Sequence, residues 1–479
     1  MKYPDAISQT TKPQETGQTT AKASEAITGA ARPMVIGLMV PIGMMILNMV
    51  MFNVALPTIR DDFLIPADMA AWLVTAYILP FVMMMPLYGR LGDGLGKRRL
   101  LLIGISIFGV GTVIALLATD LRLLLLGRVI QGMGAGAINP LSMAIISERF
   151  PATERGQALG TWNSIGPVAG IVAPLLGGFL TDTLGWRTIF GPVVLLVVAA
   201  ILAVAVLVPP GERSFIQPGF LRTLDWGGVA LLGVTITMLL FYVSSRPITG
   251  VEALQDWRLL LLMLLFFTGF VYWEKRRPNP FISLEIFGSR EFNRASLGAG
   301  IRMFTMTSIG FLTPLYLADV HALSAAAIGV MIMIHAGALF VTMRWGGQLA
   351  DRWGSRRPVV AGASIQTGGM VYFALLPGSA WLGWVAAGLI VHGLAAGLSL
   401  AALHRSAMGR IAPERIGVAA GLYSMFRFGG TALGTALGGV ILQYGLDQSL
   451  LTVQAYQLVF WFIAGVALLG VINGWGLQE

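Results

Sequence analysis

The sequence predicts an all-α integral membrane protein with 14 transmembrane helices, arranged as two six-helix pseudo-repeats plus an inserted helix pair. Three observations lead to this prediction. The chain of 479 residues is 56% apolar and 11% charged, whereas soluble domains carry about 25% charged residues. Its apolar residues gather in fourteen long runs. A charged turn between two of these runs, Gly89–Arg99, is repeated at Gly347–Arg357 with Gly, Leu, Asp, Gly, Arg and Arg in register.

Each apolar run is long enough, or nearly so, for a spanning helix, which needs about 20 mostly apolar residues. The first run begins directly after Arg32-Pro33, and charged or Gly-containing loops separate the later ones. The predicted spans, in order, are 34–56, 68–88, 98–119, 121–146, 157–181, 187–208, 223–244, 257–273, 293–317, 325–349, 357–377, 381–404, 416–443 and 454–476.

The repeated turn also predicts the domain organisation. Later landmarks keep nearly the same offset, since Glu154-Arg155 matches Glu414-Arg415 and Gly177-Gly178 matches Gly438-Gly439. Halves repeated in parallel are a plan of membrane transporters. The predicted parts are a disordered cytoplasmic tail poor in large apolar side chains, an N-terminal six-helix bundle, a two-helix linker and a C-terminal six-helix bundle, at 1–33, 34–208, 209–292 and 293–479.

The basic residues predict the orientation. Of 32 lysines and arginines, 23 fall on the side of the N-terminus and five on the other side. This bias follows the positive-inside rule, so both termini are expected in the cytoplasm. The remaining four lie inside spans: Arg128, Arg302, Arg344 and Arg427.

Composition and motifs argue against several classes of function. There is no cysteine, and the four histidines lack zinc-ligand spacing, so we expect no metal site. The basic residues are scattered over short loops, which does not favour nucleic-acid binding. Neither an H-E-x-x-H helix nor an ATP-binding glycine loop occurs. The sequence therefore predicts neither an enzyme nor an ATP-driven pump, and no cofactor.

Five motifs, in order and at matching spacing, resemble the major facilitator superfamily, specifically its fourteen-helix multidrug:proton antiporter branch. The resemblance covers nearly everything from residue 34 onward. The motifs are the charged turn Gly89–Arg99, the basic run Arg128–Gly134, the fifth-span stretch Gly160–Gly178 with Gly166, Pro167, Gly170 and Pro174, the first-span run Asn53–Pro57, and Trp72–Tyr77.

This resemblance implies a secondary transporter of the bacterial inner membrane. It would export small amphipathic compounds, such as drugs or toxic metabolites, by alternating access in exchange for protons. The expected partners are the substrate, protons and the lipid bilayer, with a periplasmic adaptor as a further candidate. Two alternatives stay open: an exporter of an anionic or lipid-like metabolite, and a transporter-like membrane sensor.

The two charged turns predict an inner gate. Asp93 and Asp351 are expected to face the positive end of a helix dipole in the opposite half. The basic residues Lys97, Arg98 and Arg356 are expected to pair with carboxylates such as Glu148 and Glu414. The alternative is that the turns only anchor the chain by their positive charge. The glycines and prolines of the fifth span, likewise, suit either a bending helix or close helix packing.

Charged side chains inside a membrane span are costly, and we interpret them as functional. Arg128 matches the basic motif, with a structural arginine as the alternative. Arg302 lies deeper and is expected to face the central cavity. His335 is the preferred proton-binding candidate, with a satisfied core histidine as the alternative. Asn53, Tyr77 and Asn163 are further candidate contacts of substrate, while Arg427 has no assigned role.

One position departs from the family pattern. The first helix usually carries an aspartate five residues before the motif asparagine, and here that residue is Asn48. None of the 23 acidic residues falls in the middle of a predicted span. Since Asn48 cannot titrate, proton coupling at the customary place is in doubt. The arginines make the inferred field positive, which favours anionic, zwitterionic or neutral substrates.

Overall fold

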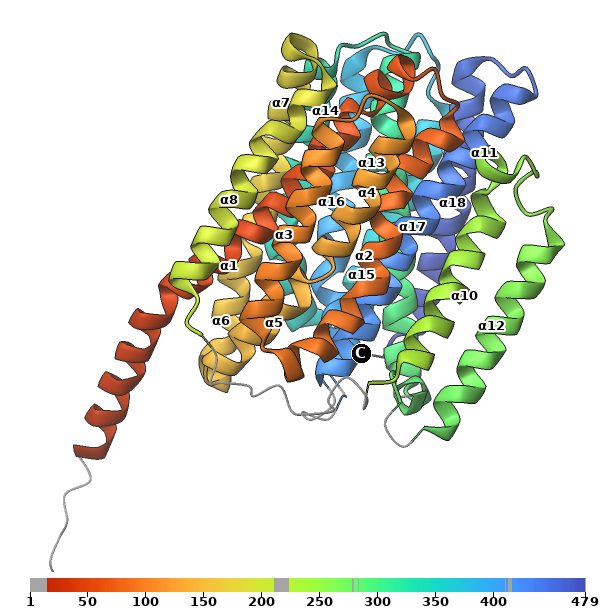
Figure 1. The fold of residues 1–479 in the computed structure, drawn as a ribbon. Coiled ribbons are helices and arrows are strands. Elements are labelled where there is room, and N and C mark those ends of the chain that lie inside the picture. Colours follow the sequence, from red (N-terminus) through yellow and green to blue (C-terminus); the bar gives the residue numbers. More distant parts are fainter. Residues whose placement is uncertain are drawn as a thin grey trace, which may run out of the picture.

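The computed structural model describes residues 15–210, 224–277, 280–282, 284–409, 411 and 416–478, and over these residues the regular elements are helices (Figure 1). The first half contains α1 (Glu15–Asp62), α2 (Ala67–Leu95), α3 (Lys97–Leu116), α4 (Leu121–Ala135), α5 (Ile138–Arg149), α6 (Ala152–Asn163), α7 (Ile165–Leu184), η1 (Trp186–Ile189) and α8 (Phe190–Leu207). The middle contains α10 (Trp226–Ser244), α11 (Arg246–Thr249) and α12 (Trp257–Arg276). The second half contains η2 (Leu284–Gly288), α13 (Arg290–Asp319), α14 (Ala325–Trp353), α15 (Arg356–Leu375), α16 (Leu382–Met408), α17 (Ile416–Asp447) and α18 (Thr452–Trp475).

The predicted spans form helices at the expected places. Within the described residues, 13 segments are long and apolar enough to cross a membrane, by length and composition. The remaining long helix is α13, with 30 residues, which carries Arg302 and several serines and threonines. Most of α13 is buried in the second half. Its polarity is therefore that of a helix surrounded by protein rather than by lipid.

Two predicted spans are each built from two consecutive helices. The fourth span consists of α4 and α5, and the fifth of α6 and α7. Pro140 and Pro167 lie three residues into α5 and α7. Because proline has no N–H, each removes a hydrogen bond to the carbonyl four residues earlier, at Gly136 and Asn163. The interruptions fall at these points.

The first helix extends beyond its predicted span. The predicted span starts at residue 34, whereas α1 already begins at Glu15. Residues 1–14, part of the tail that the sequence predicts to be disordered, lie outside the described residues. Figure 1 shows the start of α1 projecting away from the rest of the bundle.

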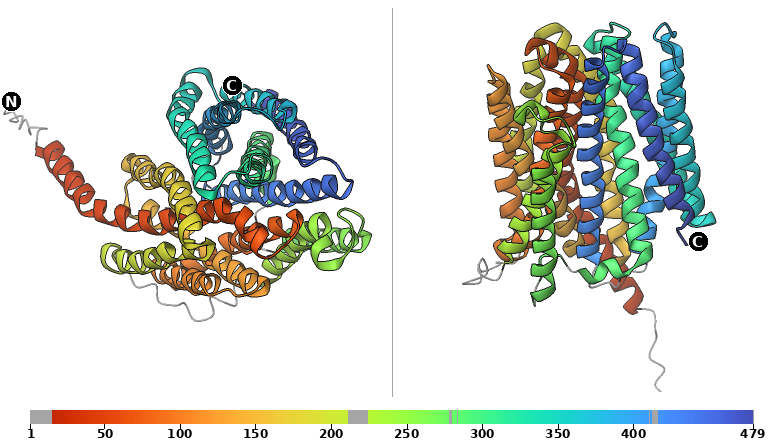
Figure 2. Two further views of the ribbon diagram at one scale, coloured as in Figure 1. Left: turned by 90° about the horizontal axis from the view of Figure 1, so that it is seen from above. Right: turned by 90° about the vertical axis from the view of Figure 1, so that its right-hand side faces the viewer.

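The predicted repeat is visible in how the two halves pack. The second helix of each half packs on the fifth helix of the other, so α2 lies against α17 and α14 lies against α7. Seen from above, the two halves lie side by side (Figure 2). The two charged turns also share their backbone conformation, since Gly96 has φ 88° and Gly354 has φ 76°. Glycine adopts this left-handed region without the strain a side chain would add.

The inserted pair lies at the side of the bundle. Helices α10 and α12 pack against each other, and α10 also contacts α2 and α17. The pair stands at the right of Figure 1, in green. In the most apolar 18-residue stretch of α12, only 11% of the residues are buried. The pair therefore covers the line where the two halves meet, with α12 outermost.

Candidate functional site

A buried arginine organises a polar network in the first half. Arg128 on α4 is 0% exposed. Its Nε donates to the Leu73 carbonyl oxygen (3.2 Å) and its Nη1 to Gln131 Oε1 (2.9 Å). The guanidinium also lies over the rings of Phe52 (4.1 Å) and Tyr77 (4.5 Å). These partners are all neutral, so π-electrons and carbonyl dipoles compensate its charge.

Asn48 belongs to the same network. Gln131 Nε2 donates to Asn48 Oδ1 (3.2 Å) and to Thr112 Oγ1 (3.0 Å). The chain from Arg128 to Asn48 thus joins α4, α3 and α1 inside the first half. The Arg128 Nη2, Asn48 Nδ2 and Tyr77 hydroxyl groups are buried without a hydrogen-bond partner among the described residues. The network holds donors that are costly to leave unpaired.

The second half holds a matching network around Arg302, which is 6% exposed. Its Nε and Nη2 donate to the Ala396 carbonyl oxygen at 3.0 and 2.8 Å. Thr305, one turn further along α13, accepts from Gln366 Nε2 (3.4 Å). A cavity of about 10 Å³ lies beside Arg302, Thr305, Gln366 and Ser399. That volume is close to the minimum for one water molecule.

His335 has a partner that the sequence did not reveal. Its Nε2 lies 3.0 Å from Nδ1 of His392 on α16, and the two rings stack with centroids 5.2 Å apart. Gln366 Nε2 lies 3.5 Å from the other ring nitrogen of His392. Both histidines are buried. The signal for this pair was only that two histidines occur within the second and fourth helices of one half.

The other candidate contacts lie in different surroundings. Asn53 on α1 faces α13, because a Cβ on Gly310 would lie 4.0 Å from Asn53 Nδ2. Tyr77 stacks on Phe81, and Phe81 meets Phe428 of α17 edge to face at 4.7 Å. Asn163 is exposed at the end of α6. The structure does not place Asn163 in either buried network.

The two halves are joined at one end of the bundle, which we call the closed end. Asp182 of α7 accepts from the backbone N–H groups of Ala325 (2.9 Å) and Ala326 (2.8 Å), the first residues of α14. Gln443 of α17 accepts from the N–H of Ala67 (2.8 Å), the first residue of α2. Each half thereby caps a helix of the other half.

An ion pair adds to these caps. Arg60 at the end of α1 lies 2.5 Å from Asp319 at the end of α13. Tyr456 also donates to Asp319 (2.6 Å). The helices approach closely nearby, since a Cβ on Gly439 would lie 2.4 Å from the Cβ of Ala71. The closed end is therefore both packed and held by polar contacts.

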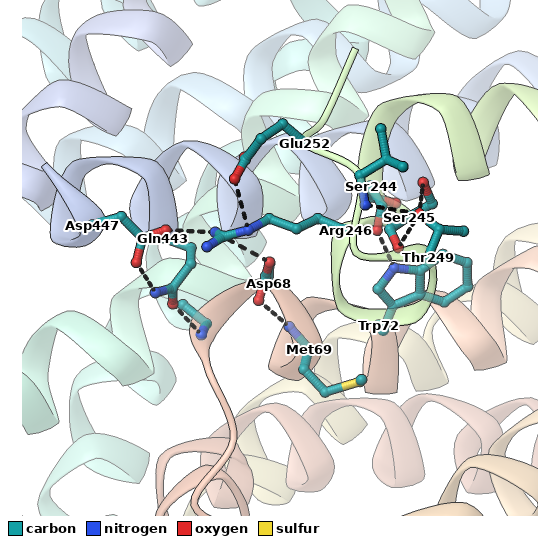
Figure 3. Close-up of polar contacts among 12 residues, drawn as sticks. Asp68, Met69, Trp72, Ser244, Ser245, Arg246, Thr249, Glu252, Gln443 and Asp447 are labelled. Carbon is teal, nitrogen blue, oxygen red and sulfur yellow. Dashed lines mark hydrogen bonds and ion pairs between the residues drawn. The ribbon is translucent and has the colours of Figure 1, made fainter. Parts of the chain in front are cut away.

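The inserted pair takes part in the closed end through Arg246 (Figure 3). Its guanidinium lies 2.5 Å from Asp447 of α17, 3.2 Å from Glu252 and 3.8 Å from Asp68 of α2. Burial alone would lower the pKa of Arg246, but the hydrogen bond and charge of Asp447, with Glu252 and Asp68, raise it above its ordinary value. The Trp72 indole nitrogen of α2 also donates to the Ser244 carbonyl oxygen of α10.

At the opposite end, the charged turns make their ion pairs within their own half. Lys97 lies 2.9 Å from Asp93 and 2.5 Å from Glu148. Asp351 lies 2.7 Å from Arg405. Asp182 and Gln443 make cross-half caps at the closed end, and the cross-half capping that the sequence predicts for Asp93 and Asp351 stays a prediction.

The remaining gating candidates also contact their own half. Arg98 donates to carbonyl oxygens of Val204 (3.4 Å) and Ala205 (2.5 Å) on α8. Arg356 lies over the Trp475 ring, 5.0 Å from its centroid. Glu414 lies outside the described residues. A latch between the halves at this end stays a prediction.

Comparisons with known proteins agree with this architecture. The sequence matches the family described as the Major Facilitator Superfamily over residues 38–293 and 295–477. The chain belongs to the major facilitator superfamily. A multidrug resistance protein, Stp, from Mycobacterium tuberculosis is 30% identical over 410 residues, covering 85% of this chain and 75% of Stp. The riboflavin transporter RibZ of Clostridioides difficile is 26% identical over 434 residues, covering 88% of this chain and 91% of RibZ.

Solved structures show the same fold. A bacterial homologue of the human lysosomal transporter Spinster, in an inward-facing and occupied conformation, has a TM-score of 0.62 at 16% identity, covering 92% of this chain and 94% of that one. The human organic anion transporter MFSD10 has a TM-score of 0.60 at 16% identity, covering 93% and 100%. The chain is thus a multi-pass membrane protein of this superfamily.

The fifth-span motif of this superfamily member lies between the halves. A Cβ on Gly329 of α14 would lie 2.3 Å from the Pro174 carbonyl oxygen, and one on Gly178 would lie 2.3 Å from that of Ala325. Gly170 faces Ala336 of α14, 3.9 Å from its hypothetical Cβ, whereas Gly166 faces Ile46 of α1. Pro167 is the third residue of α7, directly after the interruption. These contacts favour close packing as the role of the small residues.

Proposed function

We propose that this chain is a secondary active exporter of small amphipathic compounds that works by alternating access and exchanges substrate for protons. The observation that carries the proposal is the asymmetry between the two ends. Cross-half caps and the Arg60–Asp319 pair join the halves at the closed end, whereas the ion pairs that Lys97 and Asp351 of the charged turns make each lie within one half. Multidrug resistance and riboflavin transport in the names of relatives support this class of substrate.

The orientation completes the proposal. The excess of lysine and arginine lies on the side of the charged turns, which supports an orientation with that side and both termini in the cytoplasm of a bacterial inner membrane. The closed end is then periplasmic, and the conformation is inward-facing. Rocking the halves would break the caps of Asp182 and Gln443 and join the charged turns instead.

We assign proton binding to the His335–His392 pair, because Asn48 cannot titrate. One proton bound to the pair leaves one ring nitrogen donating to the other, whereas two would set two donors against each other. The pair therefore takes up a single proton. The groups that face it are Gln366 from α15 and Arg302 from α13.

Proteoliposomes containing a pH dye test the transport and coupling proposals separately. We expect riboflavin or fluorescein added to native protein to cause proton movement, which His335→Gln and His392→Gln abolish while downhill exchange of the same probe continues. His321→Gln is the matched control, since His321 lies near the closed end and contacts Tyr316 instead. Proton movement that persists in both variants would overturn the assignment. Lack of flux of either probe in native protein would overturn the export proposal.

A further inference from the structure

A cluster of basic and aromatic side chains lies at the middle of the second half. Arg302 of α13 and Arg427 of α17 lie where these two helices pack, since a Cβ on Gly300 would lie 3.0 Å from the Phe426 carbonyl oxygen, and Tyr423 lies one turn before Arg427. The charge of Arg427 is also felt at His404 of α16. The His404 ring meets the Tyr423 ring edge to face, with centroids 5.4 Å apart. The two guanidinium groups thus share one small region inside the membrane.

The two arginines differ in how they are satisfied. Arg302 directs two of its N–H groups at the Ala396 carbonyl oxygen. Arg427 has a buried Nε without a hydrogen-bond partner among the described residues. Its guanidinium carbon lies 5.6 Å from the Phe428 ring centroid. A buried donor of a charged group without a partner is costly, so the arrangement is suited to a missing acceptor.

The position of Arg427 favours a ligand over a structural partner. The neighbouring Phe428 meets Phe81 of the first half at 4.7 Å, so this stretch of α17 lies at the boundary between the halves. Gly439, which packs against Ala71 at the closed end, is 12 residues further along α17. That spacing corresponds to about 18 Å along a helix. Arg427 therefore lies well inside the closed end, toward the side that the proposed mechanism opens.

Charge balance identifies the chemistry of the ligand. The cluster contains the basic residues Arg302, Arg427 and His404, and the 23 acidic residues of the chain lie outside the middle of the predicted spans. Two like charges in a low-dielectric region repel, and an anion placed between them relieves both the repulsion and the unpaired Nε.

We propose that Arg427, with Arg302, binds the anionic group of an amphipathic substrate, a carboxylate or sulfonate, whose apolar part lies against Phe428 and Phe81. This inference deepens the proposed function by naming the charge of the substrate. The same anionic chemistry occurs in fluorescein-like small molecules and in phosphatidylglycerol headgroups, and the experiment separates the two sources.

The test measures binding rather than transport. Fluorescence anisotropy of fluorescein is recorded with the purified full chain in nanodiscs of phosphatidylcholine. We expect Arg427→Gln to weaken fluorescein binding at least about tenfold, as loss of a charge-assisted hydrogen bond implies. Arg427→Lys should retain part of the affinity. Arg405→Gln is the control, because Arg405 lies at the end of α16 and pairs with Asp351.

A neutral probe distinguishes recognition from damage to the fold. Riboflavin binding, followed by its own fluorescence, should change less than about twofold in Arg427→Gln, since that variant loses only the anion-specific contact. An equal loss of affinity for both probes would show a structural role of Arg427 and overturn the inference. Fluorescein affinity that is unchanged in Arg427→Gln would overturn it as well. If riboflavin is transported but fluorescein binding does not depend on Arg427, this inference alone is refuted. If fluorescein binding depends on Arg427 but no probe is transported, the proposed export alone is refuted.

A second arm identifies the occupant. Phosphatidylglycerol is added to the nanodiscs, and fluorescein binding is measured again. Competition in the native chain that disappears in Arg427→Gln supports the anion site with the lipid headgroup as an occupant. Absence of competition supports the same site with a free small anion as its ligand.

Discussion

Asp182 and Gln443 hold equivalent positions in the two halves, and each caps the second helix of the half to which it does not belong. Asp182 accepts from the first N–H groups of α14, and Gln443 from the first N–H of α2. The residues that they cap, Ala67 and Ala325, are as far apart in the sequence as the two charged turns are. The pseudo-symmetry of the chain thus produces a matched pair of polar links at one end.

We expect Asp182→Ala to open the closed end. Loss of an N-cap costs about 1 kcal/mol, which corresponds to a severalfold rise in the open population. The chain has no cysteine, so Ala71→Cys provides a single buried thiol between α2 and α17. Its reaction with a membrane-impermeant maleimide should accelerate severalfold in Asp182→Ala. The control is Asp256→Ala, which removes a cap within the inserted pair; equal acceleration there would contradict the prediction.

Arg246 is expected to hold the inserted pair to both halves. Arg246→Gln leaves the buried Asp68 and the half-exposed Asp447 without their cation. We expect a loss of about 1–2 kcal/mol, toward the low end because Asp447 is accessible to water. A fall of a few degrees in the unfolding temperature, followed by tryptophan fluorescence, would confirm this, with exposed Arg258→Gln as the control.

The pH dependence of that link follows from the raised pKa of Arg246. A cation with a raised pKa contributes its full stabilisation below its ordinary pKa and loses it only as pH rises through the higher native pKa. The difference in unfolding temperature between native and Arg246→Gln protein should therefore stay constant between about pH 7 and pH 10. A difference that shrinks over this range would contradict the assignment.

Asn48→Asp should restore a carboxylate to the first helix without disturbing the fold. Asn48 Nδ2 has no partner among the described residues, and Gln131 can still donate to the remaining oxygen. Arg128, which has neutral partners, would then have a negative charge near it, since Gln131 is hydrogen-bonded to both Arg128 and residue 48. We expect the free energy of unfolding of this variant to lie within about 1 kcal/mol of that of the native protein. In proteoliposomes, we expect more proton movement per riboflavin molecule transported than in the native protein. Unchanged proton movement would show that the carboxylate does not take part in coupling.

Neighbouring glycines of α17 offer a test of packing with its own control. A Cβ on Gly430 would lie 2.0 Å from the Gly300 carbonyl oxygen of α13, whereas a Cβ on Gly429 meets no atom within 4 Å. Gly430→Ala should destabilise the second half by about 1–3 kcal/mol, the usual cost of overpacking. Gly429→Ala should leave the unfolding temperature unchanged or slightly raised. The reverse order would refute the predicted packing of α13 and α17.

Much of the fold follows from local sequence features, whereas the polar networks depend on tertiary contacts. The apolar runs predict the long helices of the described residues, because all of them except α13 have to be apolar wherever their neighbours lie. The offset between Gly96 and Gly354 predicts the repeat, because the same turn needs glycine in both halves. By contrast, His335 and His392 are 57 residues apart, and nothing local to either indicates their contact.

The candidate site shows the same division. Arg128 and Arg302 could be singled out from the sequence, because a charge inside an apolar run is conspicuous. Their partners are backbone carbonyl groups, glutamine side chains and aromatic rings. Such groups are common in apolar runs, so the sequence does not single them out. Asp182 and Arg246 lie at helix ends, where charged residues are common, so their links across the molecule needed the folded structure.

The composition of α13 has a consequence for how the protein is made. α13 leaves the ribosome before α16 and α17, against which it packs. A helix carrying Arg302 and many hydroxyl groups partitions poorly into lipid by itself. Its insertion therefore awaits the helices that follow, and the second half enters the bilayer as one assembly. Truncation after α13 should leave that segment untranslocated, although the eight described spans that precede it insert normally.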